Sequence, residues 1–188
     1  MAKSLRSGQA AVFGPEQLTQ LWAELEQPYR VITQICYYTA ARCGEVVSLE
    51  RSDLQGDRIV YRAAKTKTKT TREAIVTEQL KGALAIAGLP GAGYLFPGGG
   101  GGGHITVRAV DKHLRRAAAL VGVEGASTHS FRRSMATHLH LNGVSLRAIQ
   151  RVTGHSTLAS LERYLDVSGL EAAGAQQRVL DQLFAAIA

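Results

Sequence analysis

The sequence predicts a mainly α-helical domain that carries one small antiparallel β-sheet. Apolar residues recur at helical spacing along most of the chain, beginning with Leu18, Leu21, Trp22 and Leu25. Residues 58–77 instead hold two runs rich in β-branched residues, which are typical of strands. The chain has 188 residues, of which 45% are hydrophobic, so it can bury a full core as an α+β domain.

The segment before the β-type runs is predicted to form three helices. Pro15 suits a first helical turn and opens the first of them. An apolar stripe that starts at Val31 predicts a second helix, which ends near Arg42. Gly44 permits a break, and the apolar residues of 46–49 indicate a further short helix.

The β-type runs are Arg58–Arg62 and Arg72–Thr77, joined by the alternating stretch AAKTKTKTT. They predict a hairpin or a three-stranded antiparallel sheet. A helix is expected over Glu78–Ala87. Residues 97–104 contain six consecutive glycines, which predict a flexible surface loop. No Gly-Lys-Ser/Thr motif follows this loop, so it is not a phosphate cradle.

The rest of the chain is predicted to be helical, with caps of Ser or Thr and stops at Gly. The expected helices are 107–121, 128–142 with Thr128 as the cap, Ser145 to Gly154, Thr157 through Leu165, and roughly 170–187. We therefore expect a lead-in segment over 1–13, one domain over 14–168 and a C-terminal helix or tail over 169–188.

The charge of the chain indicates the kind of partner it binds, and its cysteine content indicates the cellular compartment. The formal net charge is +7 and the sequence pI is about 9.7, which favours a polyanion such as nucleic acid. Cys36 and Cys43 are placed in one helical segment, where two turns separate them by about 10 Å, too far for a disulfide. No apolar run approaches the roughly 20 residues of a membrane span. We expect reduced thiols, a cytoplasmic protein and no membrane partner.

Four segments hold residues suited to cutting DNA without a metal ion or ATP. That reaction needs fixed cations for the phosphate, an in-line nucleophile and a proton donor for the leaving oxygen. The residues are Arg42 with Glu45, the lysines of the hairpin, His129 with Arg132, and His155 with Tyr164 nine residues later. His129 and Arg132 are three residues apart and share a helix face.

In this order and spacing, the segments resemble the tyrosine recombinase, or phage integrase, family. The family pattern is Arg-x-x-Glu-x-x-x-Leu, a hairpin lysine, His-x-x-Arg, Gly-His and a tyrosine nine residues after that histidine. The matching residues are Arg42, Glu45 and Leu49, the run TKTKTTR, His129 and Arg132, Gly154 and His155, and Tyr164. Each motif alone is weak, but five in order over residues 14–168 form a specific pattern.

The resemblance implies an integrase-like catalytic domain that breaks and rejoins DNA. It implies that Arg42 and Arg132 clamp the scissile phosphate and that Glu45 orients Arg42. His129 and His155 would hydrogen-bond the same phosphate or move protons. The implied activity is site-specific recombination or integration on double-stranded DNA, with no cofactor.

The resemblance also implies the nucleophile and the acid. Tyr164 would attack phosphorus to form a 3′-phosphotyrosine, and Lys67 would protonate the leaving 5′ oxygen. Lys65 is the second choice for the acid. Lys65, Lys67 and Lys69 alternate, so a continuous strand would point all three the same way. We also expect Lys65, Lys69, Arg72 and Arg133 to contact DNA.

Other interpretations remain open from the sequence. The chain could be a topoisomerase that uses the same intermediate, or a DNA-binding module without activity. Tyr164 taken alone could be an ordinary packing residue, and His138 and His140 could suggest a metal pair, although no further ligands lie near them in sequence. Members of the family commonly carry a further N-terminal domain that clamps DNA. The C-terminal helix either packs on its own domain or docks on a neighbouring copy.

Overall fold

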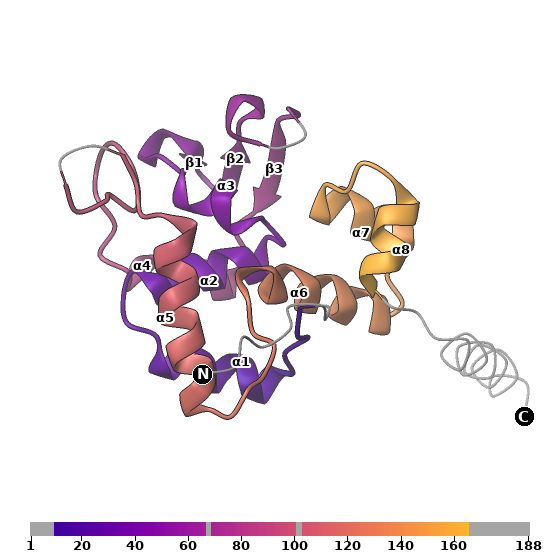
Figure 1. Cartoon of the computed structure of the whole chain (residues 1–188). Coiled ribbons are helices and arrows are strands. Elements are labelled where there is room, and N and C mark those ends of the chain that lie inside the picture. Colours follow the sequence, from indigo (N-terminus) through magenta and orange to yellow (C-terminus); the bar gives the residue numbers. More distant parts are fainter. Residues whose placement is uncertain (1–9, 67–68, 101–102, 166–188) are drawn as a thin grey trace, which may run out of the picture.

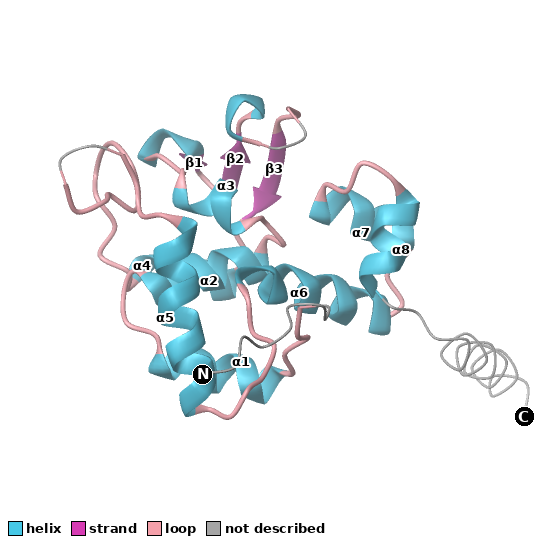
Figure 2. Ribbon diagram, viewed as in Figure 1, coloured by secondary structure: helices cyan, strands magenta, loops and turns pink. Residues whose placement is uncertain are grey.

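The computed structural model describes residues 10–66, 69–100 and 103–165 (Figure 1). Within these residues the fold is mainly helical with one small antiparallel sheet, which confirms the predicted class (Figure 2). The helix expected over 170–187 and most of the lead-in over 1–13 lie outside the described residues.

Three helices precede the sheet, and they are α1 (Pro15–Glu24), α2 (Tyr29–Tyr38) and α3 (Cys43–Val47). The strands are β1 (Leu54–Gln55), β2 (Arg58–Tyr61) and β3 (Arg72–Ile75), paired antiparallel in the order β1-β2-β3. The helices that follow are α4 (Glu78–Ala85), α5 (Val107–Leu120), α6 (Thr128–Leu141), α7 (Leu146–Thr153) and α8 (Leu158–Leu165). Single 3-10 turns, η1 (Arg51–Asp53) and η2 (Ala63–Lys65), flank the first two strands.

Two hydrophobic clusters hold these elements together, and α6 contributes to both. The larger cluster draws on α1 to α5, the sheet and the start of α6, where the ring of Phe131 meets the edge of Phe13 at a centroid distance of 5.2 Å. The smaller cluster joins α6, α7 and α8. It is formed by the buried residues Ala136, Ile149, Leu161 and Leu165. Helices α7 and α8 therefore form a separate unit at the far end of α6 (Figure 1).

The helix caps follow the sequence with one exception. The Ser145 hydroxyl accepts the N–H of Ala148, and the Thr157 hydroxyl accepts the N–H of Ser160, as expected. Gly154 ends α7 in the left-handed conformation, at φ +68°. Helix α6 differs, because its N-cap is Ser127 and the predicted cap, Thr128, is its first helical residue.

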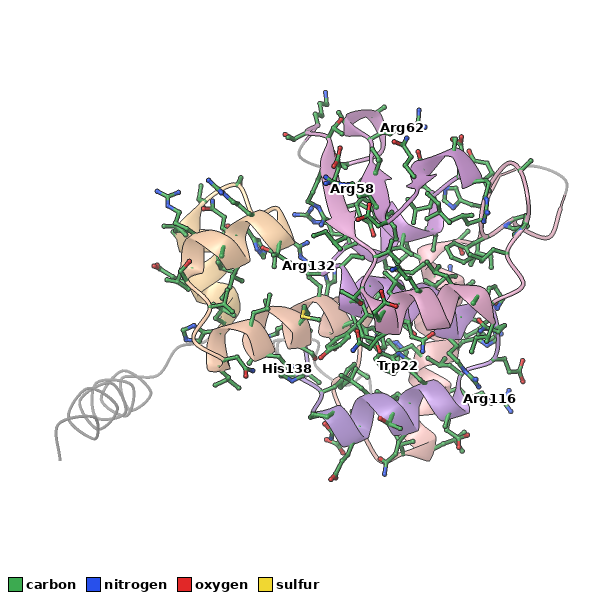
Figure 3. The ribbon with its side chains drawn as sticks, turned by 180° about the vertical axis from the view of Figure 1, so that it is seen from behind. Trp22, Arg58, Arg62, Arg116, Arg132 and His138 are labelled. Atoms are coloured by element: carbon green, nitrogen blue, oxygen red, sulfur yellow. The ribbon has the colours of Figure 1, made fainter. Side chains whose placement is uncertain are left out.

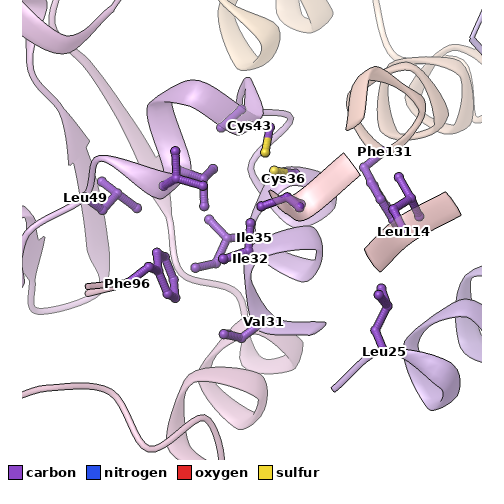
Figure 4. Packing of buried hydrophobic residues seen from close by; sticks show 14 of the residues in the cluster. Leu25, Val31, Ile32, Ile35, Cys36, Cys43, Leu49, Phe96, Leu114 and Phe131 are labelled. Atoms are coloured by element: carbon purple, nitrogen blue, oxygen red, sulfur yellow. The ribbon is translucent and has the colours of Figure 1, made fainter. Parts of the chain in front are cut away.

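The placement of the two cysteines in one helix is wrong. Helix α2 ends at Tyr38 and α3 begins at Cys43, so a turn of the chain separates the two residues. This turn brings both buried thiols together in the core rather than two helical turns apart (Figure 4). A hydrogen bond to Cys43, followed by burial, raises the pKa of the Cys36 thiol well above its ordinary value. Both cysteines are free thiols.

The lysine run between the two strands is not itself a strand in the residues that the structure describes. Strand β2 ends at Tyr61, and Lys65 lies at the end of the turn η2. Lys69 adopts a positive φ of +50°, which no strand residue has. The argument that a strand would point the lysines the same way therefore does not apply to Lys65 and Lys69. Lys67 lies outside the described residues.

Replacing Phe131 with Ala tests whether the junction of α6 with the larger cluster holds the fold. The Phe131 side chain is fully buried. Its loss should lower the free energy of unfolding by about 3–5 kcal/mol, because it removes transfer energy and leaves a cavity. The measurement is urea unfolding followed by circular dichroism. Leu141→Ala is the control, since Leu141 is 61% exposed on the same helix. Equal losses in both variants would contradict this account of the core.

Candidate functional site

A cavity of about 430 Å³ lies where the α2–α3 turn, the hairpin loop and the end of α7 meet. It is lined by Arg42 and Glu45, by Thr66 and 70–72 of the hairpin, and by residues between Gln150 and Ser156. The lining thus comes from three segments that are distant in the sequence. Each of them carries one of the motifs identified in the sequence.

Arg42 is held at the start of α3 by Glu45. The Glu45 carboxylate accepts the backbone N–H of Arg42 at 3.1 Å and its guanidinium Nη1 at 3.0 Å. Glu45 is the third residue of α3, a position from which a carboxylate can reach back to the residue preceding the helix. Glu45 is buried, whereas Arg42 is 25% exposed. The contact has the geometry that the predicted orienting role requires.

Arg132 reaches the same region from α6, and its side chain is labelled in Figure 3. It is 2% exposed. Its Nη1 donates to the carbonyl of Ala40 at 2.6 Å, and its Nη2 lies 3.3 Å from Nε2 of His155. Ala40 is left-handed, at φ +49°, and follows the C-cap of α2. His129, one turn before Arg132 on α6, is exposed.

The neighbours of His155 determine which ring nitrogen carries the proton. A guanidinium can only donate, so Nε2 of His155 accepts from Arg132. Nδ1 then carries the hydrogen and donates to the hydroxyl oxygen of Thr153 at 2.7 Å. The Thr153 hydroxyl donates in turn to the carbonyl of Ile149 at 2.8 Å. Thr153 is a site residue that the sequence analysis missed, although it stands two positions before the histidine.

His155 is neutral at neutral pH in this arrangement. Burial, and then the positive charges of Arg132 and Arg42, lower its pKa from 6.5 to about 4. Both arginines therefore act on one imidazole. Arg132 contacts His155 directly, and Arg42 and His155 line the same cavity, so the three motif residues lie close together.

The remaining predicted site residues are placed only in part. Tyr164 lies on α8, which packs on α6 and α7, but its side chain and that of Lys65 are outside the described residues. Lys69 is exposed at the hairpin. Arg133 is buried, and its guanidinium donates to the carbonyl of Ala10. Its contact with DNA stays a prediction.

No cluster of three or more His, Cys, Asp or Glu residues suited to a metal ion occurs within residues 10–66, 69–100 and 103–165. His138, one half of the suspected metal pair, instead places Nδ1 2.8 Å from the hydroxyl of Tyr37. In the same part of the chain, none of the helices has the length and apolar character needed to cross a membrane.

The lowered pKa of His155 predicts a loss of stability in acid. The unfolded chain binds a proton at His155 near pH 6.5, whereas the folded chain binds it only near pH 4. The contribution of His155 to the free energy of unfolding is therefore complete above pH 6.5 and is lost as the pH falls through 4. We expect an NMR titration midpoint of the imidazole near 4. Urea unfolding at pH 7 and pH 4.5 should show a smaller acid-induced loss in His155→Asn than in the parent. A midpoint at or above 6 would contradict the contacts described.

Comparisons with known proteins identify the family of the chain. Residues 12–170 match the phage integrase family. Similar curated proteins are tyrosine recombinase XerC of Rhodospirillum centenum, 33% identical over 73% of this chain and 42% of that protein, and XerD of Rhizobium meliloti, 30% identical over 72% and 46%. This chain thus spans less than half the length of either.

Solved structures show the same fold. The catalytic domain of bacteriophage HP1 integrase has a TM-score of 0.65 and 24% identity, with coverage of 89% of this chain and 95% of that one. A XerA recombinase has a TM-score of 0.73 and 21% identity, with coverage of 91% and 66%. By its match over residues 12–170, the chain belongs to the phage integrase family.

Proposed function

We propose that this chain is the catalytic part of a tyrosine recombinase, which cleaves and rejoins double-stranded DNA through a 3′-phosphotyrosine at Tyr164. The observation that carries the proposal is the convergence of Arg42, Arg132 and His155 at one cavity, where Arg132 contacts His155 and Arg42 lines the same wall. Two guanidinium groups with an imidazole suit a phosphodiester, because guanidinium stays charged and donates paired hydrogen bonds to phosphate oxygens.

The proposed reaction exchanges one phosphoester bond for another. The hydroxyl of Tyr164 loses its proton to solvent as its oxygen attacks phosphorus, and the bond from phosphorus to the 5′ oxygen breaks. The leaving oxygen takes a proton from Lys67, with Lys65 as the alternative donor. Arg42 and Arg132 stabilise the charge that develops on the non-bridging oxygens. The new ester keeps the energy of the broken bond, so a 5′ hydroxyl can reverse the step without a nucleotide cofactor.

DNA binding would change the protonation of His155. In the free protein its Nε2 accepts from Arg132 and has no hydrogen to donate. A phosphate anion in the cavity favours the charged imidazole, which donates from both nitrogens. Nε2 would then donate to a phosphate oxygen while Nδ1 keeps its bond to Thr153. His129, exposed on the first turn of α6, is proposed as a further donor to the same phosphate.

The named relatives support DNA recombination over the alternatives. They are recombinases and integrases, and none of those cited above is described as a topoisomerase. A further fold neighbour is an integrase of transposon Tn1549 in complex with circular intermediate DNA, with a TM-score of 0.76 and 17% identity. We accordingly propose double-stranded DNA as the partner, contacted also by Lys65, Lys69 and Arg133, and the cytoplasm as the place of action.

Replacing Tyr164 with Phe tests the nucleophile. The protein is incubated with a pool of nicked duplexes of random sequence, in which cleavage releases a short fragment and traps the adduct. The parent should give DNA that stays bound in denaturing gels, and Tyr164→Phe should give none, because only the attacking oxygen is removed. Both proteins should bind the pool equally. An adduct formed by the Phe variant would place the nucleophile elsewhere, and no adduct from the parent would overturn the proposed activity.

Replacing Arg42 with Ala tests the phosphate clamp. The rate of adduct formation at saturating DNA should fall by about 100-fold to 1000-fold, the cost of removing one preorganised donor from a developing oxyanion. Arg115→Ala is the matched control, because Arg115 is half exposed and pairs with Asp111 on α5. A near-normal rate in Arg42→Ala would remove Arg42 from the clamp.

Deleting residues 169–188 tests self-association. We propose that this segment, which lies outside the described residues, passes to a neighbouring copy when two sites assemble on DNA. Sedimentation on DNA with two sites should show a multimer for the full chain and single occupancy for the truncated chain, with cleavage of a single site retained. Equal assembly by both chains would exclude the exchange.

A further inference from the structure

Arg72 makes contacts that its predicted role on DNA does not explain. It is the first residue of β3, and its side chain is 14% exposed. Its Nη1 donates to the carbonyl of Thr39 at 3.1 Å and to the carbonyl of Val152 at 2.9 Å. Its Nη2 lies 3.5 Å from the Glu45 carboxylate, and its Cζ lies 4.5 Å from the centre of the Tyr61 ring.

These contacts join two parts of the molecule. Thr39 and Glu45 belong to the α2–α3 region, which carries Arg42 and packs in the larger hydrophobic cluster. Val152 belongs to α7, which packs with α8 on the far part of α6 (Figure 1). A single guanidinium thus connects the hairpin to both sides of the cavity, and the residue to which it binds on α7 lies three positions before His155.

The absence of a side chain at Gly154 leaves space for the contacts of Arg72. A side chain at residue 154 is disfavoured by the positive φ of +68°, and a Cβ there would also lie 3.1 Å from Cδ of Arg72. The glycine of the Gly-His motif therefore has two structural roles. It turns the chain from α7 toward His155, and it leaves room for the Arg72 side chain to pass to the Val152 carbonyl.

We infer that Arg72 is a positioning residue that holds the α7–α8 unit, which carries His155 and Tyr164, in register with Arg42 and Glu45. The inference rests on the proposed function for its catalytic consequence, but the bridge itself is a property of the free protein. The planar guanidinium of Arg72 suits this role because its several N–H groups reach acceptors at the end of α2, on α3 and on α7 at the same time.

The test uses Arg72→Lys and Arg72→Gln, with Arg58→Gln as the control. Arg58 lies on the neighbouring strand, is 55% exposed and pairs with Glu73. Lysine keeps the charge but loses the fork. Both Arg72 variants should form the adduct at least about tenfold more slowly at saturating DNA, since small misplacements of reacting groups are costly. Their affinity for the DNA pool should stay close to that of the parent, and Arg58→Gln should react normally.

A second measurement follows the His155 imidazole in the free protein by NMR. Arg72→Lys keeps the local charge, so a rise of the midpoint from about 4 toward 6.5 reports that α7 has moved away from Arg42 and Arg132. This measurement needs neither DNA nor activity. If the parent forms no adduct, the proposed function fails, while the NMR titration still decides the positioning role.

Three results would overturn the inference. In the first, Arg72→Lys reacts like the parent. In the second, the variants bind DNA weakly but react normally at saturation, as a simple phosphate contact would. In the third, the His155 midpoint is the same in the parent and in Arg72→Lys. If Arg72→Gln does not fold, Arg72→Lys carries both measurements.

Discussion

The geometry of the site depends on two carbonyl groups that directly follow the end of α2. Two consecutive residues past the end of this helix, Thr39 and Ala40, offer their carbonyl oxygens to Arg72 and Arg132. A helix carries partial negative charge at its C-terminus, so this is a favourable place for cations. The left-handed Ala40 turns the backbone there, and Arg42 follows two residues later. One turn of chain therefore anchors two arginines and presents a third.

Gathering these cations has an electrostatic cost that the protein offsets locally. A buried guanidinium such as Arg132 loses its hydration, which is unfavourable unless its N–H groups find acceptors. Carbonyl oxygens and the Nε2 lone pair of His155 provide them. Glu45 adds the negative charge between Arg42 and Arg72. The guanidinium groups of Arg42, Arg72 and Arg132 thus outnumber the single carboxylate of Glu45, and this surplus of positive charge suits the phosphate of the proposed reaction.

The division into two clusters also has a functional meaning under the proposed reaction. Helix α3, which follows Arg42, packs in the larger cluster, whereas α7 and α8, which flank His155 and carry Tyr164, pack in the smaller one. If hydrophobic packing acted alone, α6 would be the only connection that sets the position of one cluster relative to the other. Polar contacts to the α7–α8 unit, from Arg132 on α6 to His155 and from Arg72 on β3 to Val152, add the second and third points of attachment. Three points fix an orientation that one helix cannot.

Much of this protein could be predicted from local pattern. Helical and β-type periodicity gave the class of the fold, and Ser145, Thr157 and Gly154 marked helix ends correctly, because caps and left-handed turns depend on one or two residues. The order of the motifs pointed to the residues around the cavity. The sequence also determined the pairing of Arg42 with Glu45, since the two lie one turn apart.

Only the tertiary structure decided the contacts between segments that are distant in the chain. Arg72 donates to a partner on α7 that is 80 residues away, and no local pattern reports that contact. The two cysteines were assigned to one helix, because periodicity could not show the turn that brings them together. The tautomer of His155 depends on Arg132 across 23 residues. Periodicity records which face of a segment is apolar, whereas the partner of a polar group is chosen only when the segments pack.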